Sequence, residues 1–331
     1  IDASLKESEL ILEGKTWRIN PNNQIKYDKK NWTIAGLDLQ EENQVISINT
    51  YQSEQSQDNI RLVFSNVNLH QLSQWAYAKN ETSPIGGLLN GNIQVEHFTG
   101  KPALYVDAQM SQLAVADDSL GILRAQISTS DSLQKVLTDI VWNEAGKTHY
   151  IKGFYDLIDK TSPLHFNAKL DRLDLLHIEP LIQDILSHKA GLIVGDLEIT
   201  GTPEKPIING EGNLYRAEMT VNYIGTHYRM DPAHYSVKNS VIKLDEFKFR
   251  DSLRRTGTAS GTIDLRNLNA VALDLKFDLN KMLVMKTSFE QNELFYGTAI
   301  ASGIITLKGP VSSLVIGADA KTERGTAVFI P

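Results

Sequence analysis

The stretch Leu273-Asp274-Leu275-Lys276-Phe277-Asp278-Leu279-Asn280 decides the fold class, because its odd-numbered residues are all apolar and its even-numbered residues are all polar. Successive side chains of a β-strand point to opposite faces of a sheet, so this alternation predicts a strand with one apolar and one polar face. The same alternation occurs in residues 104–110, 242–244 and 247–249. The chain is therefore predicted to be rich in strands that need an apolar cover on one side.

An internal repeat sets the organisation of the chain. Gly91-Asn92-Ile93-Gln94-Val95 recurs as Gly195-Asp196-Leu197-Glu198-Ile199 and as Gly303-Ile304-Ile305-Thr306-Leu307. These segments are about 105 residues apart, and a turn containing Gly and Pro leads from each into another apolar run. We predict one continuous β-groove made of a partial preceding repeat at 1–59, a first repeat at 60–163, a second at 164–272 and a partial third at 273–331.

Helical patterns are few and fall at equivalent places in the repeats, at residues 68–79, 173–189 and 281–295. The middle pattern has an apolar stripe at helical spacing, formed by Leu175, Ile178, Leu181, Ile182, Ile185 and Leu186. One short helix in each repeat is too little to cover the strands. The apolar face must therefore pack on a second sheet, close on itself, or remain a trough that an apolar ligand fills.

A closed core is the alternative to an open trough. A β-helix coil takes about 20 to 30 residues, and an array of sandwich domains would show a separate closing pattern about every 100 residues. A unit of about 105 residues that continues its sheet into the next fits neither of these architectures, so the repeat length favours the trough.

Composition excludes several classes of function. The chain has 331 residues, no cysteine, and a net charge of −7 that comes from interspersed acids and bases. Disulfides, thiolate metal sites and cysteine nucleophiles are thus excluded, and no basic cluster favours nucleic acid. The sequence contains no Gly-x-Ser-x-Gly elbow, no phosphate-binding glycine loop and no His-Glu-x-x-His motif. We therefore expect a non-enzymatic protein without catalytic residues, cofactor or metal, which binds no nucleic acid.

The ends of the sequence bear on membrane attachment. The chain begins at Ile1 rather than at a methionine and ends within a strand-like pattern, so we expect it to be a piece of a longer protein. No apolar run approaches the roughly 18 residues that a membrane-crossing helix needs. Any signal peptide or membrane anchor is therefore expected in a part of the parent chain outside this sequence.

The segment Gly191-Leu192-Ile193-Val194-Gly195-Asp196-Leu197-Glu198-Ile199-Thr200-Gly201-Thr202-Pro203, followed by Pro206-Ile207-Ile208-Asn209-Gly210, resembles the C-terminal repeat region of the TamB family, which belongs to the AsmA-like group. The ending at Gly309-Pro310 and 320–326 resembles that region too. The resemblance covers residues 60–331, and its specificity comes from the order and period of the motifs.

This resemblance implies an elongated, taco-shaped β-sheet with a hydrophobic concave groove in the periplasm of a diderm bacterium. It implies phospholipid transport between the inner and outer membranes, and support of outer-membrane biogenesis beside an Omp85-type partner of the TamA kind. An anchor in the inner membrane is implied for a part of the parent chain that is not present here.

The predicted fold class is thus all-β, with an antiparallel or mixed sheet and few short helices. The predicted lining of the lipid groove consists of the apolar residues of the alternating strands, namely Leu62, Phe64, Leu104, Val106, Ala108, Phe166, Leu197, Ile199, Leu244, Phe247, Phe249, Leu273, Leu275, Phe277 and Leu279. The alternative function is a protein-interaction module, in which an open sheet edge at residues 326–330 pairs with a strand of an outer-membrane barrel.

Overall fold

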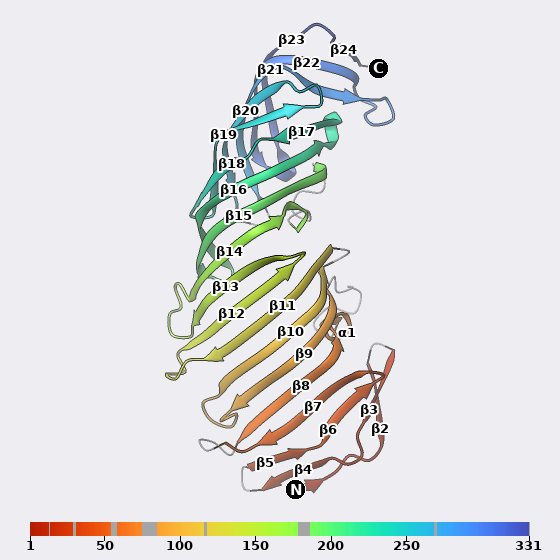
Figure 1. Ribbon diagram of the computed structural model, residues 1–331, viewed down its shortest axis with the longest axis vertical. Helices are drawn as coiled ribbons and strands as arrows, with labels where there is room; N and C mark the ends of the chain where they lie inside the picture. Colours follow the sequence, from red (N-terminus) through yellow and green to blue (C-terminus); the bar gives the residue numbers. More distant parts are fainter. Residues whose placement is uncertain are drawn as a thin grey trace. The chain divides into compact units, whose positions relative to one another are not determined.

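The computed structural model describes residues 1–12, 14–28, 31–53, 58–74, 85–115, 118–177, 186–267 and 270–330. The chain divides into a first unit, Ile1–Phe166, and a second unit, Asn167–Pro331. Both units are built from long strands with few helical turns, as the ribbons of Figure 1 show, and this confirms the all-β prediction. The strand pairings of the sheets described below are antiparallel.

The first unit contains a curled sheet whose strands pair in the order β2–β3–β6–β7–β8–β9–β10–β11–β12–β13. Their bounds are Ser8–Leu12, Lys15–Ile19, Leu37–Glu41, Gln44–Tyr51, Asn59–Asn68, Ile85–Glu96, Ala103–Val115, Asp118–Thr129, Lys135–Glu144 and Lys147–Asp156. A small sheet of β1 (Asp2–Ala3), β4 (Gln24–Asp28) and β5 (Asn31–Ala35) lies beside β7. The helix α1 (Leu69–Gln74) follows β8, and β14 (Leu164–Asp174) begins in this unit and ends in the next.

The second unit starts its ladder with β15 (Leu186–Thr202) and β16 (Lys205–Val221). Two shorter strands, β17 (Thr226–Met230) and β18 (Ala233–Lys238), both pair with β16 on one side and with β19 on the other. The ladder continues through β19 (Val241–Asp251), β20 (Thr256–Asp264), β21 (Ala272–Thr287) and β22 (Tyr296–Pro310). It ends with β23 (Val315–Thr322) and β24 (Ala327–Phe329), which both pair with β22; short 3-10 turns lie at Asn222–Ile224 (η2) and Val311–Ser313 (η4).

Several of the described long strands are interrupted by β-bulges, and at five of these bulges two residues that include one with a positive φ angle oppose one residue of the partner strand. The residues with positive φ at these five bulges are Asn66, Gln112, Arg216, Glu246 and Lys281. An extra residue in a strand makes the two apolar residues that flank the bulge point to the same face, and it increases the local twist of the sheet. The residue that follows each bulge is buried, as in Val67, Leu113, Ala217, Phe247 and Met282.

The three marker glycines lie inside long strands, namely Gly91 in β9, Gly195 in β15 and Gly303 in β22. Gly91 has a φ angle of 140°, and a Cβ atom there would lie 2.2 Å from the carbonyl oxygen of Asp107 on β10. Glycine is therefore required at this position by the close approach of the neighbouring strand. The equivalent placement of the three markers agrees with the repeat period, whereas the repeat boundaries stay a prediction.

The three predicted helices have different outcomes. Within the first, at 68–79, α1 occupies Leu69–Gln74, and residues 75–79 lie outside the described part. The second, at 173–189, is wrong at its two ends, because β14 extends to Asp174 and β15 begins at Leu186. Residues 175–177 form a 3-10 turn, and residues 178–185 are not described. The third, at 281–295, is also wrong, because the bulge at Lys281 continues β21 as a strand to Thr287.

Candidate functional site

The apolar face of the first unit is the side of its sheet on which the inward residues of the alternating strands lie in register. One row across five adjacent strands, β7 to β11, consists of Ile48, Leu62, Ile93, Val106 and Ile127. All five side chains are only half-buried. We call this row the first open row, because the described chain covers its side chains incompletely.

The second unit has an equivalent apolar face. Ile242, Ile263 and Leu273 pair in register across β19, β20 and β21, and all three are half-buried. In the next row toward the bulges, Leu244 and Leu275 lie on either side of Gly261, and Leu307 follows on β22. We call these six residues the second open rows, of which Leu244 also packs against the sealed cluster of this unit.

Each apolar face also has a sealed part near the bulges. In the first unit it is a buried cluster of Trp17, Ile46, Val67, Leu69, Leu89 and Leu113, to which α1 contributes Leu69. In the second unit the sealed cluster consists of Phe247, Phe249, Ala259, Leu279 and Met282. The chain therefore closes its own core at one end of the strands and leaves the apolar rows toward the other end half-covered.

The fifteen predicted lining residues fall into three groups. Those that lie half-buried on described strands away from the sealed clusters are Leu62, Leu104, Val106, Phe166, Leu197, Ile199, Leu273 and Leu275. Those that are partly buried and pack against the sealed clusters are Phe64, Ala108, Leu244 and Phe277. Those inside the second sealed cluster are Phe247, Phe249 and Leu279, which are 2%, 6% and 6% exposed and are covered by the chain's own side chains.

Sequence reasoning missed several residues of the open rows. Ile93, Ile127, Ile242, Ile263 and Leu307 lie in the same rows as predicted residues. A signal for two of them was present, because Ile93 and Leu307 are the third and fifth residues of marker segments whose glycine lies on the same face.

The sealed part of the second unit is closed by the long end of β21. Beyond the bulge, the Leu283 amide donates to Asp251 Oδ2 at 2.6 Å, and the Tyr228 hydroxyl donates to the Leu283 carbonyl at 3.0 Å. Burial raises the pKa of Tyr228 to about 12, since the phenolate would be desolvated there. The glycine after η2, Gly225, has its Cα so close to β21 that a Cβ would lie 2.3 Å from the Lys286 carbonyl oxygen.

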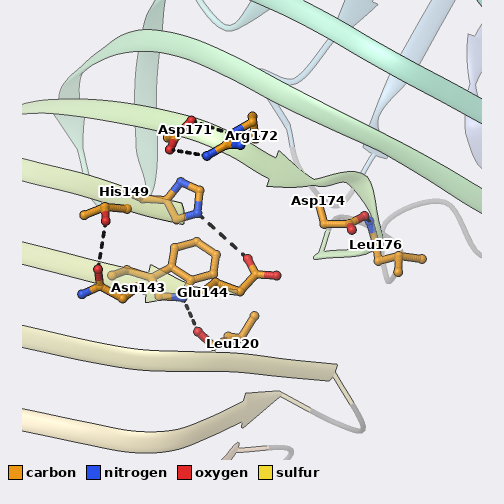
Figure 2. Close-up of polar contacts among 10 residues, drawn as sticks. Leu120, Asn143, Glu144, His149, Asp171, Arg172, Asp174 and Leu176 are labelled. Carbon is orange, nitrogen blue, oxygen red and sulfur yellow. Dashed lines mark hydrogen bonds and ion pairs between the residues drawn. The ribbon is translucent and has the colours of Figure 1, made fainter. Parts of the chain in front are cut away.

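Polar groups also occur at the bulge end of the first unit, where Figure 2 shows the ring of His149 facing Glu144. His149 is 1% exposed, its Nε2 lies 4.0 Å from Glu144 Oε2, and its ring centroid lies 4.5 Å from that of Trp142. The Trp142 indole N–H donates to the Leu120 carbonyl. These contacts tie β11, β12 and β13 together.

The opposite face of the first unit is polar. It carries a shallow hollow lined by residues that include Asn92, Gln94, Asp107 and Asp139. The Lys152 ammonium lies 2.7 Å from Asp139 Oδ2, and both side chains are substantially exposed. Exposed ion pairs contribute little to stability, so this pair is expected to add little to the stability of the sheet.

The edge of the second unit is formed by β23 and β24. Among the described residues, no further strand pairs with either of them. Val315, Ile316 and Phe329 on this edge are 66%, 60% and 56% exposed. A strand edge with free backbone groups and exposed apolar side chains can accept another strand.

Two further properties concern the described residues only. No helix among them is both long and apolar enough to cross a membrane. Three or more His, Asp or Glu side chains do not come together anywhere in this part of the chain in a way that would hold a metal ion.

Comparison with known proteins gives one match. Residues 245–331 match the family model of the TamB C-terminal domain, which confirms the resemblance for that part of the chain. No curated protein and no solved structure matches the chain.

Proposed function

Because residues 245–331 match the TamB C-terminal domain, a cell-envelope family connected with outer-membrane assembly, we propose that this chain is a periplasmic segment that shields the acyl chains of phospholipids. It would carry them between the inner and outer membranes. The parent chain would be anchored in the inner membrane by a part not present here. No catalytic residue and no cofactor take part in this proposal, in which the protein is not an enzyme.

The observation that carries the proposal is the incomplete cover of the apolar rows. Exposing acyl chains to water costs about 0.8 kcal/mol per methylene, so a two-tailed phospholipid with about thirty methylenes faces a barrier of about 20 kcal/mol in an aqueous compartment. Half-buried side chains such as Val106 and Leu275 offer apolar surface that a tail can cover. Apolar contact is non-directional, so selectivity among acyl chains is expected to be low.

The test places a charge in an open row and measures bound lipid. Leu275→Asp in the second unit and Val106→Asp in the first should each remove most of the phospholipid that co-purifies with the chain, as counted by native mass spectrometry. The matched controls are Lys276→Asp and Tyr105→Asp, which introduce the same side chain at the neighbouring position on the polar face. Both controls should keep their lipid.

Circular dichroism of all four variants shows whether the sheet is intact. If the wild-type chain carries no lipid, or if the two polar-face variants lose as much lipid as the apolar-face variants, the proposal is wrong.

A second candidate function is favoured by the free edge of β23 and β24. We propose that this edge pairs with a strand of an Omp85-type outer-membrane protein, which would make the chain an interaction module that assists outer-membrane protein insertion. The backbone groups of the edge would supply the affinity, and the exposed side chains of Val315 and Ile316 would add apolar contact.

Removing residues 326–331 tests this edge pairing. The shortened chain should lose the Omp85-type protein in a pull-down while it keeps its lipid content. Ile158→Ser serves as control, because Ile158 is 65% exposed in a turn of the first unit and its loss should change neither readout. An unchanged pull-down after the truncation would count against edge pairing and leave the lipid proposal untouched.

A further inference from the structure

Five apolar residues at one corner of the second unit are grouped on the surface. Tyr223 lies in η2, and Phe289, Leu294, Phe295 and Tyr296 lie in or beside the turn that joins β21 to β22. Leu294 is 71% exposed, Tyr223 is 55% exposed and Phe289 is 50% exposed. We call these five residues the aromatic corner.

The aromatic corner is held together by its own contacts. The rings of Tyr223 and Phe295 meet edge to face with their centroids 5.2 Å apart, and those of Phe289 and Tyr296 do so at 5.6 Å. The Asn292 side chain bridges the two segments, because its Nδ2 donates to the Tyr223 carbonyl at 3.4 Å and its Oδ1 accepts from the Leu294 amide at 3.0 Å. Side-chain bonds of this kind define the conformation of a turn.

The exposed members of the corner are not needed to complete the core. Met285 and Thr287, at the end of β21 just before the turn, are already buried while Leu294 and Phe289 remain exposed. Exposed apolar side chains that gather into a patch mark a surface that contacts a membrane or another protein. The corner therefore has the character of a contact surface.

Charge and side-chain type distinguish the kind of partner. The turn carries two exposed acids, Glu290 and Glu293, and only Lys286 as a nearby base before it. An anionic membrane attracts clusters of Lys and Arg, which this turn lacks. Phe and Leu enter the boundary between headgroups and acyl chains, whereas Tyr keeps its hydroxyl at the level of the headgroups.

We propose that the aromatic corner docks on the surface of a bilayer of zwitterionic phospholipid, with Phe289 and Leu294 inserted below the headgroups. This inference rests on the proposed function in one respect, since a segment that carries phospholipid has to meet a membrane to take it up or release it. The corner would make that contact at the bulge end of β21 and β22.

Flotation with phosphatidylcholine vesicles tests the inference. The wild-type chain should float with the vesicles, and Phe289→Ser combined with Leu294→Ser should weaken its partitioning by about tenfold or more, since two apolar side chains would no longer be buried. The control combines Ile11→Ser with Ile158→Ser, which removes two comparably exposed apolar side chains from the first unit. The control should float as the wild type does.

A second measurement covers the case in which the double variant fails to fold. In a Leu294→Trp chain, indole emission should shift to the blue on addition of vesicles and should be quenched by brominated acyl chains, relative to the same measurement on the wild type. Equal flotation of the corner variant and the wild type, absence of quenching, or binding only to phosphatidylglycerol vesicles overturns the inference. Co-purified lipid that is retained in the corner variant shows that the proposed function stands when docking fails.

Discussion

The apolar face is divided into a sealed part and an open part. This division predicts that truncating two apolar residues of the same strand will change the free energy of unfolding by different amounts. Met282 is 0% exposed within the sealed cluster, so Met282→Ala should leave a cavity and cost about 3 kcal/mol of unfolding free energy. Leu275 lies on the same face of β21 but is only half-buried. Truncation there removes about half of a buried leucine, so Leu275→Ala should cost about 1 kcal/mol.

These costs translate into different melting temperatures. For a cooperative unit about the size of Asn167–Pro331, each kcal/mol lowers the melting temperature by about 2–4 °C. Met282→Ala should therefore lower it by about 6–12 °C and Leu275→Ala by about 2–4 °C. The order should be reversed for bound lipid. Leu275→Ala should lower the lipid content more than Met282→Ala does, because Leu275 faces the space assigned to the ligand and Met282 does not.

The assay compares both variants after delipidation, so that bound lipid does not add to the stability of the folded chain. Calorimetry gives the melting temperatures, and native mass spectrometry after reloading gives the lipid content. Equal destabilisation by the two truncations would refute the reasoning, because it would mean that Leu275 belongs to a sealed core. Loss of lipid from Met282→Ala alone would refute it as well.

Three other outcomes are expected. Gly225→Ala should destabilise the chain by about 2 kcal/mol or more in a urea titration, whereas Gly146→Ala, which also has a positive φ but has no atom within 4 Å of its Cβ position, should cost only about 1 kcal/mol. Deletion of Lys281 should turn the rest of β21 onto the wrong face, and hydrogen exchange should show loss of protection after the bulge. Hydrogen bonds from Arg266 lower the pKa of Asp264 to about 2. The stabilising contribution of the Asp264 carboxylate is therefore present above the ordinary carboxyl pKa and is lost as the pH falls through about 2. Arg266→Ala should return the pKa of Asp264, followed by NMR titration, toward its usual range.

The strands of the second unit were predictable where alternation is unbroken. Leu273–Asn280 in the sequence is the regular part of β21, and its odd residues lie on the apolar face as expected. Prediction failed at Lys281, where the alternation breaks and a helix was expected instead. A bulge breaks the period of two without ending the strand, and only the pairing with β22 reveals it.

The bulges leave a sequence signal that can be recognised in retrospect. Apolar residues separated by two polar ones flank the bulge in Phe64-Ser65-Asn66-Val67, Leu244-Asp245-Glu246-Phe247 and Leu279-Asn280-Lys281-Met282. Spacing of three also occurs in helices, so the local sequence alone does not distinguish the two structures. Whether such a segment forms a bulged strand or a helix depends on the strand that it pairs with, and that strand lies elsewhere in the chain.

For the candidate site, the sequence predicted which side chains lie on the apolar face of the sheet. It did not predict which of these side chains remain accessible. Alternation identified which residues share the apolar side, including Leu62 and Val106 in the first unit. It could not distinguish Leu275, which is half-buried, from Leu279, which is 6% exposed on the same strand. Exposure depends on which residues from other strands pack over the sheet, and Leu279 is buried in a cluster with Phe247 and Phe249 of β19.

The bulges connect the fold to the proposed function. By keeping Met282 on the same face as Leu279, the bulge in β21 concentrates the well-packed residues at one end of the strand, where they supply stability. The residues toward the other end, such as Leu273 and Leu275, are then free to contact a ligand without being required for folding. A closed core would need all of them buried against protein. A half-covered apolar row is stable here because the sealed end holds the sheet, and this is the property that a surface for acyl chains requires.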